Sequence, residues 1–254
     1  MTSNTKIALV TGGSRGLGKN MALRIAEKGI DVVLTYHSKQ EEAQAVVRQI
    51  EGLGQKATAL QLDTGAVKEF DQFLSQLSST LQDHFGTDKI NFLINNAGIG
   101  IWAPFAETTE EQFDNVFNIQ FKGVFFLTQK ALPLLADGGS IINISTGLTR
   151  MTNPGYSAYS SAKAAVENLT RYQAKELGER GIRVNVVAPG AIETDFAGGS
   201  VRDNKDINKV IADNTALGRV GLPDDIGGIV AFLCTEDARW MNAQRLEVSG
   251  GQML

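Results

Sequence analysis

Residues 6–18 read Lys-Ile-Ala-Leu-Val-Thr-Gly-Gly-Ser-Arg-Gly-Leu-Gly, and this stretch decides the fold of the chain. An apolar run, Ile7–Val10, breaks into a glycine-rich turn, and residues 19–27 follow with helical spacing. Glycines permit a tight turn and a close approach of backbone to ligand, while the free N–H groups and the dipole at a helix start face an anion. We therefore expect a diphosphate to bind here, although an ordinary strand-to-helix turn would look similar.

The composition is that of an ordinary globular protein. The chain has 254 residues, of which 43% are hydrophobic and 20% charged. Its net charge of −4 gives no reason to expect nucleic acid or an anionic membrane as a partner. One cysteine excludes an intramolecular disulfide, and the two histidines, His37 and His84, lack the spacing of a metal site. Because no signal peptide or apolar run of about 20 residues is found, we expect a cytoplasmic protein.

Short β-branched runs alternate with amphipathic segments along the whole chain, which predicts an α/β fold with one doubly wound parallel sheet of seven strands. No linker or repeat divides it, so residues 1–254 are predicted to form a single domain. A polar, glycine-containing segment at about 193–217 is interpreted as a flap over a binding site. The expected strands are Ile7–Thr11, Asp31–Tyr36, Ala57–Leu62, Ile90–Asn95, Ser140–Ser145, Arg183–Val187 and Arg245–Val248. The expected helices are 16–28, 39–53, 67–84, 109–134, 157–179 and 223–235.

Four phenylalanines lie at four-residue intervals in the predicted helix 109–134, namely Phe113, Phe117, Phe121 and Phe125. They share one face of a helix, and this face must be covered. The cover is either the sheet or a second subunit.

Tyr159 and Lys163 are four residues apart within a predicted helix and therefore lie on the same face. A tyrosine with an ordinary pKa near 10 is a poor acid–base catalyst at neutral pH. A neighbouring ammonium stabilises the phenolate and lowers that pKa toward neutrality. The strand before this helix ends in Ser145 and Thr146, whose hydroxyl groups could hold a substrate carbonyl oxygen.

Together these residues resemble the short-chain dehydrogenase/reductase family over essentially the full length, above all NADPH-dependent carbonyl reductases and 3-oxoacyl-[acyl-carrier-protein] reductases. The matching segments stand in order in the chain: Thr11–Gly18, Asp63, Asn95–Gly98, Tyr159-x-x-x-Lys163 and Pro189-Gly190. The resemblance implies a Rossmann fold, hydride transfer with a nicotinamide cofactor, and a homotetramer in which two long helices form one interface.

The resemblance also implies a role for each matching residue. Tyr159 would exchange a proton with the substrate oxygen, and Lys163 would bind the nicotinamide ribose and lower the pKa of Tyr159. Asp63 would bind adenine. The cofactor would further contact the glycine turn, the segment after the fourth strand and the segment after the sixth: Gly12, Ser14, Arg15, Gly16, Leu17, Gly18, Asn96, Ala97, Gly98, Pro189, Gly190, Ile192 and Thr194.

The sequence departs from the family pattern at two positions. Thr146 stands where the family has serine, thirteen residues before the tyrosine; it keeps the hydroxyl, and Ser145 is the alternative. Neighbours in a strand face opposite sides, so the two are not expected to share the role. Gln120 stands in place of the family asparagine that supports a water-linked proton relay, with Asn118 as the alternative.

The second strand predicts the cofactor. Relatives that use NAD carry an acid at its end, whereas this chain has Tyr36, His37, Ser38 and Lys39 there. Arg15 in the glycine turn, with the residues that follow Tyr36, could surround a 2′-phosphate, since the planar guanidinium forms paired bonds to phosphate. NADPH is therefore expected rather than NADH.

The residues expected around the substrate are mostly apolar or aromatic: Trp102, Leu148, Met151, Tyr156 and Phe196. They favour a neutral hydrophobic ketone, or the corresponding secondary alcohol, over a charged acid. The leading prediction is an NADPH-dependent carbonyl reductase. An NAD-linked alcohol or sugar dehydrogenase is the enzymatic alternative, and a protein that binds a dinucleotide as a sensor, without chemistry, is the alternative from another class.

Overall fold

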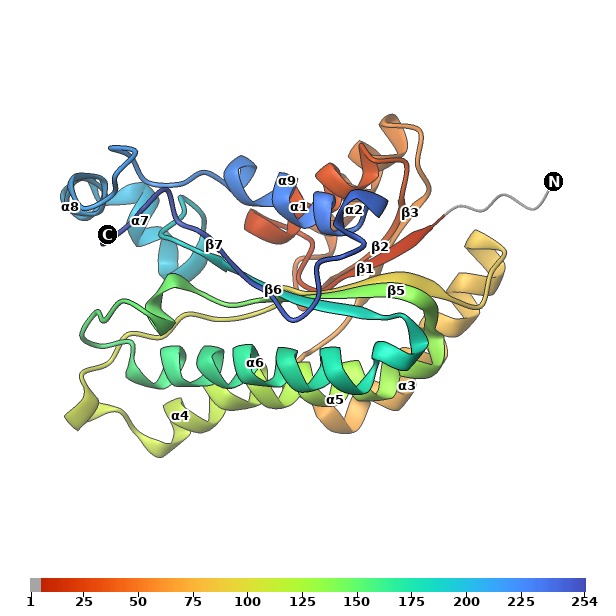
Figure 1. Cartoon of the computed structure of the whole chain (residues 1–254), viewed down its shortest axis with the longest axis horizontal. Helices are drawn as coiled ribbons and strands as arrows, with labels where there is room; N and C mark the ends of the chain where they lie inside the picture. The colour runs from red at the N-terminus through yellow and green to blue at the C-terminus, as the bar shows by residue number, and fades with distance from the viewer. Residues whose placement is uncertain (1–5) are drawn as a thin grey trace.

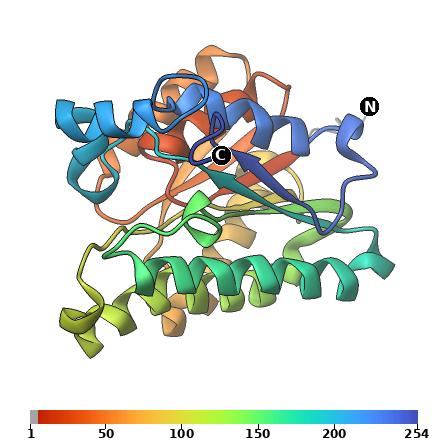
Figure 2. The same ribbon diagram turned by 60° about the vertical axis from the view of Figure 1, so that its left-hand side comes forward.

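The computed structural model of the protein describes residues 6–254 and contains a sheet of parallel strands between two layers of helices (Figures 1 and 2). The order across the sheet is β3-β2-β1-β4-β5-β6-β7. The predicted doubly wound, seven-stranded parallel sheet is thus confirmed. The strands are β1 (Ile7–Val10), β2 (Asp31–Tyr36), β3 (Ala57–Gln61), β4 (Ile90–Asn95), β5 (Leu135–Ile144), β6 (Arg183–Pro189) and β7 (Arg245–Val248).

Two apolar cores, one on each face of the sheet, hold the helices. Along β1 the side chains alternate between the two faces. Ala8 and Val10 belong to the core under the helices at 16–26, 40–52 and 223–233. Ile7 and Leu9 belong to the core under the helices at 70–80, 123–131 and 157–176. No helix within residues 6–254 has the length and apolarity needed to cross a membrane. The helices are α1 (Gly16–Ala26), α2 (Gln40–Gly52), α3 (Phe70–Thr80), α4 (Glu110–Phe117), α5 (Gly123–Ala131), α6 (Ser157–Glu176), α7 (Ser200–Asp203), α8 (Lys205–Asp213) and α9 (Pro223–Leu233).

The segment predicted as one helix, 109–134, is interrupted. A π-helical turn over Asn118–Lys122 separates α4 from α5. Of the four regularly spaced phenylalanines, Phe113 is 41% exposed, and Phe117 and Phe121 pack on a small cluster that includes Val116 of α4 and Tyr159 of α6. These rings therefore cover the neighbouring helix rather than the sheet.

The reversal of strand order creates the crevice in which a ligand can bind. The chain leaves β1 toward β2 and β3, and then returns to the other side of β1 with β4. Loops that follow β1 and β4 therefore diverge at the carboxyl ends of the strands. In Figure 1 this end of the sheet lies on the left, beside α7 and α8.

Candidate active site

A cavity of about 1260 Å³ opens at the carboxyl ends of the strands. Its walls come from the turn after β1, the loops after β2 to β6, the π-helical turn, α6 and the segment 194–211. A volume above the usual range for a single drug-sized ligand leaves room for a dinucleotide together with a substrate.

The glycine turn at one end of the cavity is packed too tightly at Gly18 for a side chain at that position. A Cβ atom on Gly18 would lie 2.1 Å from the carbonyl oxygen of Gly12. The turn is tied to β2, because the amide of Gly12 donates to Thr35 Oγ1 (3.1 Å) and the amide of Gly13 donates to the Thr35 carbonyl (2.8 Å). Within the described chain no side chain caps the start of α1, so its first N–H groups remain available to an anion.

Thr11 joins this turn to the segment after β4. Its Oγ1 accepts hydrogen bonds from the amides of Asn96 (2.9 Å) and Ala97 (3.0 Å), and Asn96 Nδ2 donates to the Thr11 carbonyl (2.8 Å). The segment Asn96–Gly98 is thereby held against the glycine turn, where both line the cavity.

Tyr159 and Lys163 lie on the face of α6 that is turned toward the sheet. Both are nearly buried, with exposed fractions of 7% and 3%. The side chain of Thr146 interacts with the Tyr159 hydroxyl, and Lys163 Nζ donates to the carbonyl of Ile144 (2.8 Å). The Lys163 ammonium nitrogen lies 6.0 Å from the centre of the Tyr159 ring. Residues at the end of β5 and just after it thus contact both Tyr159 and Lys163 of α6.

Burial sets the charge of both groups. It raises the pKa of the Tyr159 hydroxyl well above its usual value, against a smaller opposing effect of the hydrogen bond with Thr146. Burial lowers the pKa of Lys163 to about 7. Any lowering of the Tyr159 pKa by Lys163 is therefore outweighed here, and that role of the lysine stays a prediction. Tyr159 keeps its proton at neutral pH, as a general acid requires.

Ser145 and Thr146 face different surroundings. Thr146 lines the cavity and interacts there with the Tyr159 hydroxyl, and its Oγ1 accepts from the amide of Leu148 (3.3 Å). Ser145 Oγ instead donates to Oε1 of Glu167 (2.6 Å). The structure thus brings the hydroxyl of Thr146, rather than that of Ser145, to the tyrosine.

Gln120 is completely buried in the π-helical turn. Its Nε2 donates to the carbonyl of Ile99, and a Cβ atom on Gly98 would lie 2.7 Å from its Oε1. Within residues 6–254 the Oε1 atom has no hydrogen-bond partner. Both Gln120 and Asn118 line the cavity, so an unpaired amide oxygen is buried beside the proposed site.

The far end of the cavity is aromatic. The ring of Phe196 lies 5.7 Å from that of Tyr159, and the ring of Tyr156 lies 6.5 Å from it. Leu148 and Trp102 also line the cavity, while Met151, expected at the substrate, is absent from the described lining. Trp102 Nε1 donates to the carbonyl of Pro154 (3.2 Å), which orients the indole over the loop before α6.

The comparisons with known proteins agree with this geometry. Residues 12–253 match the profile of a family described as enoyl-(acyl carrier protein) reductase. The chain is 38% identical to a hydroxynaphthalene reductase-like protein, Arp2, of Metarhizium brunneum, covering 98% of this chain and 95% of that protein. The chain belongs to the short-chain dehydrogenase/reductase family.

Two solved structures of this family resemble the fold closely. The reductase LugOII, described as catalysing keto-reduction at C1 during lugdunomycin biosynthesis, has a TM-score of 0.93 and 37% identity, with 98% of both chains covered. The angucycline C-6 ketoreductase LanV with bound NADP has a TM-score of 0.93 and 34% identity, with 98% of this chain and 95% of that chain covered.

In this short-chain dehydrogenase/reductase nearly all the residues predicted for the site line the one cavity. The exceptions are Met151, noted above, and Tyr36, whose partly buried side chain packs on the core under α1. His37 Nε2 is 3.7 Å from Asp63 Oδ2, and Arg15 Nη1 is 3.9 Å from Asp195 Oδ2. The predicted residues in the lining are Gly12, Ser14, Arg15, Gly16, Leu17, Gly18, His37, Ser38, Asp63, Asn96, Ala97, Gly98, Gln120, Ser145, Thr146, Tyr159, Lys163, Pro189, Gly190, Ile192 and Thr194.

Sequence reasoning missed several residues that build the site. Thr11 and Thr35 support the glycine turn, and Gln252 Oε1 accepts from the amide of Ala191 (2.9 Å) in the loop after β6. Gln252 is 61 residues from its partner and has no local signal. Glu167, which binds Ser145, could have been noticed as the residue one helical turn after Lys163.

The lowered pKa of Lys163 predicts a pH-dependent stability. Without cofactor, the wild type should gain about 2 kcal/mol in free energy of unfolding between pH 7 and 9, relative to Lys163→Met. The sign follows because the folded pKa of about 7 lies below the unfolded 10.5, so the unfolded chain binds more protons throughout that window. Urea unfolding at pH 7, 8 and 9 measures this difference.

The matched control for this experiment is Lys175→Met, which removes an exposed lysine from the same helix. Its stability should follow the wild type at every pH. If the curves of Lys163→Met and the wild type ran parallel, the lysine would keep its ordinary pKa when folded.

Proposed function

We propose that this protein is an NADPH-dependent carbonyl reductase for neutral, hydrophobic and in particular ring-fused aromatic ketones. The observation that carries the proposal is that the side chains of Thr146 and Tyr159 interact in the cavity that the glycine turn and the aromatic side chains also line. Lys163 is the buried cation beside them. These three side chains are the groups that a carbonyl reduction requires at the substrate oxygen.

The proposed mechanism assigns one task to each side chain. NADPH, when bound, supplies the hydride that reduces the carbonyl carbon. The Thr146 hydroxyl donates a hydrogen bond to the substrate oxygen and stabilises the charge that develops on it. Tyr159 gives that oxygen its proton, and a pKa raised by burial keeps the proton on the tyrosine until the oxygen becomes basic. Lys163 binds the ribose hydroxyls and stabilises the phenolate that remains.

Gln120 fits the relay that returns a proton to this pair. Among the described residues its buried Oε1 has no hydrogen-bond partner, so it can accept a hydrogen bond from a water molecule. The glutamine would then support the water-linked relay in place of the family asparagine. The glutamine side chain is one methylene longer, and the absence of a Cβ atom at Gly98 leaves room for its amide group.

The cofactor assignment rests on the charges near the end of β2. This edge of the cavity is lined by Arg15, His37, Ser38 and Lys39, with no acid at residues 35–39. Arg15 is 54% exposed and touches Asp195 only loosely, so it is free to turn toward a 2′-phosphate. The glycine turn fits a diphosphate, because its backbone is closely packed at Gly18 and no described side chain caps the start of α1. LanV, solved with NADP bound, is consistent with this choice.

The substrate class rests on the aromatic end of the cavity. Phe196 and Tyr156 flank Tyr159, and planar rings stack well against such walls. LanV has also been solved with NADP and rabelomycin bound. The name of the relative Arp2 refers to hydroxynaphthalene, a fused bicyclic aromatic compound. We therefore assign a ring-fused aromatic ketone to this chain.

The segment 193–217 is proposed to act as a flap over the cofactor and substrate. It contributes Thr194, Phe196 and Ile207 to the cavity wall. Positive φ angles at Ala197, Gly198 and Gly199 mark a sharp change of direction behind Phe196. We also propose a cytoplasmic homotetramer with α4–α6 at one interface, where Phe113 and Tyr172 are exposed.

The test of the proposed function is a set of initial rates with NADPH and NADH, using 2-tetralone as a bicyclic aromatic ketone and cyclohexanone for comparison. We expect NADPH and 2-tetralone to be preferred. Arg15→Ala should raise KM for NADPH about tenfold, as expected for loss of a phosphate-bound arginine, and leave KM for NADH unchanged.

Lys28→Ala, which removes an exposed cation beyond the end of α1, serves as the control for net charge. A wild type that prefers NADH would overturn the cofactor assignment. No NADPH oxidation with any ketone would favour a dinucleotide sensor instead.

A further inference from the structure

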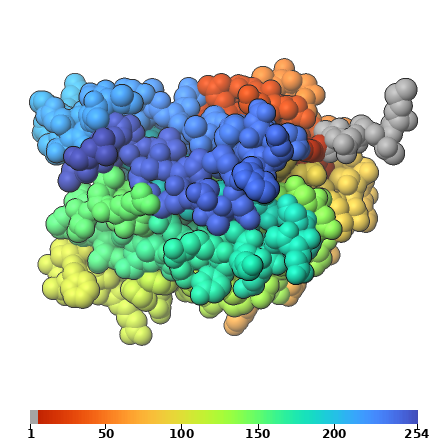
Figure 3. Space-filling view, viewed as in Figure 1, coloured from red at the N-terminus to blue at the C-terminus, as the bar shows by residue number. Residues whose placement is uncertain are grey.

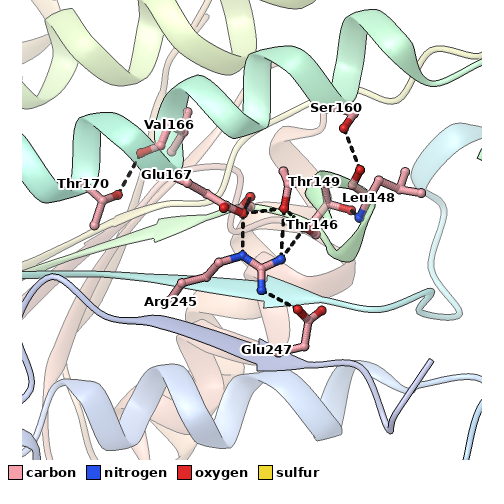
Figure 4. Close-up of polar contacts among 10 residues, drawn as sticks. Thr146, Leu148, Thr149, Ser160, Val166, Glu167, Thr170, Arg245 and Glu247 are labelled. Atoms are coloured by element: carbon pink, nitrogen blue, oxygen red, sulfur yellow. Dashed lines mark hydrogen bonds and ion pairs between the residues drawn. The ribbon is translucent and has the colours of Figure 1, made fainter. Parts of the chain in front are cut away.

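Behind the turn that carries Thr146 lies a polar cluster of which only Ser145 belongs to the cavity lining described above. We call it the Arg245 cluster; it consists of Ser145, Thr149, Glu167, Arg245 and Glu247 (Figure 4). It joins three elements, since Glu167 belongs to α6, Arg245 and Glu247 to β7, and the others to the loop after β5. On the face seen in Figure 3 the C-terminal part of the chain (blue) lies against α6 (teal).

All three nitrogen atoms of the Arg245 guanidinium donate hydrogen bonds, and only 10% of the side chain is exposed. Nε donates to Oε1 of Glu167 (2.8 Å), and Nη1 donates to Oε2 of Glu247. Nη2 donates to the carbonyl oxygen of Thr146 (3.2 Å) and to Oγ1 of Thr149 (3.0 Å). The arginine therefore holds the backbone carbonyl of Thr146 itself.

Glu167 holds the same loop at both ends. Its Oε1 accepts from Ser145 Oγ (2.6 Å) and from Thr149 Oγ1 (2.8 Å), in addition to the guanidinium. Glu167 lies one helical turn after Lys163 on α6. One carboxylate thus fixes the residues before and after the Thr146 turn relative to the helix that carries Tyr159.

The Arg245–Glu167 pair is partly buried, with 10% and 19% of the two side chains exposed. The cost of removing charges from water offsets much of their attraction, so such a pair is a weak source of net stability. The pair is better explained by the geometry it enforces, because Nη2 of Arg245 binds two residues of one loop, Thr146 and Thr149. Here the enforced geometry is that of the 145–149 turn, which carries Thr146, and the Thr146 side chain interacts with the Tyr159 hydroxyl.

We propose that Arg245 and Glu167 are positioning residues for catalysis, which hold the Thr146 hydroxyl at the distance from Tyr159 that carbonyl reduction needs. The inference rests on the proposed function, in which Thr146 binds the substrate oxygen. Neither residue reaches the reacting atoms. Their effect passes through the carbonyl of Thr146 and the hydroxyls of Ser145 and Thr149.

A double-mutant cycle between Arg245→Gln and Thr146→Val separates this role from simple stabilisation. With NADPH and 2-tetralone, Arg245→Gln should lower kcat by about 10–100-fold, as small misplacements of a reacting group do. The dissociation constant for NADPH, measured by fluorescence, should stay the same within about twofold. In the Thr146→Val background Arg245→Gln should change kcat by less than about twofold, because no hydroxyl remains to be misplaced.

Two further variants protect the test against misfolding. Glu167→Gln retains an oxygen that accepts from Ser145 and Thr149 but removes the charge that holds Arg245; it should give a smaller loss of kcat than Arg245→Gln. Arg180→Gln is the matched control, since Arg180 also pairs with an aspartate (Asp137) and binds two carbonyls, those of Leu132 and Leu135, at the opposite end of β5. It should lower the melting temperature and leave kcat unchanged.

Two results would overturn the proposal: an unchanged kcat in Arg245→Gln, or an equal fold-loss with and without the Thr146 hydroxyl. Failure of the proposed function has a different signature. In that case the wild type itself would not oxidise NADPH with the ketone, before any variant is compared.

Discussion

Tyr159→Phe is expected to lower kcat for ketone reduction by about 10³-fold, within the range usual for loss of a general acid. The ring should remain in place, because its packing near Phe196 and Tyr156 does not depend on the hydroxyl. The proton that the substrate oxygen receives in the wild type is then missing. Steady-state rates with NADPH and 2-tetralone measure the loss.

The same variant should bind NADPH with an unchanged dissociation constant, since Lys163 and the glycine turn are untouched. Tyr172→Phe is the matched control, because it removes a hydroxyl from an exposed tyrosine (61%) on the same helix. It should keep wild-type kcat. If Tyr159→Phe kept more than about a tenth of the wild-type rate, another group would have to be the acid.

Thr146→Val is expected to lower kcat by about 10²–10³-fold, the usual loss when one donor to a developing oxyanion is removed. Valine has nearly the shape of threonine, so the turn and its bond to Arg245 through the Thr146 carbonyl should persist. Thr146→Ser keeps the hydroxyl and should retain most of the activity. The comparison isolates the hydroxyl from the shape of the side chain.

Ser145→Ala tests the alternative assignment of the carbonyl-binding hydroxyl. Ser145 Oγ donates to Glu167, so its loss should disturb the turn and lower kcat less than Thr146→Val does. The reverse order of the two losses would transfer the role to Ser145.

The fold and the cofactor end of the site followed from short-range patterns. The apolar run Ile7–Val10, the glycine turn and the helix after it lie within about twenty residues, and local spacing specifies such a unit. Tyr159 and Lys163 are one helical turn apart, so their shared face was readable as well. The interruption of the helix at Asn118–Lys122 was not readable, because a π-helical turn inserts a residue without a distinctive composition.

Long-range contacts decided the rest. Arg245 reaches Thr146 across 99 residues and Glu167 across 78, distances at which periodicity carries no information. The direction of a side chain at the end of a strand is likewise a tertiary property: Ser145 turned to Glu167, Thr146 to Tyr159, and Tyr36 into the core. Burial, too, exists only in the folded chain, and it raised the pKa of Tyr159 where the Tyr–Lys spacing predicted a lowering.

By itself, then, the sequence determined the Rossmann-type sheet, the diphosphate turn and the tyrosine–lysine pair, because each is encoded within one strand, turn or helix. Only the tertiary structure decided which hydroxyl meets the tyrosine and what holds it there. The reason is physical: hydrogen-bond partners and desolvation depend on which elements pack together, and residues of β5, α6 and β7 that are far apart in the sequence are neighbours only in the folded chain.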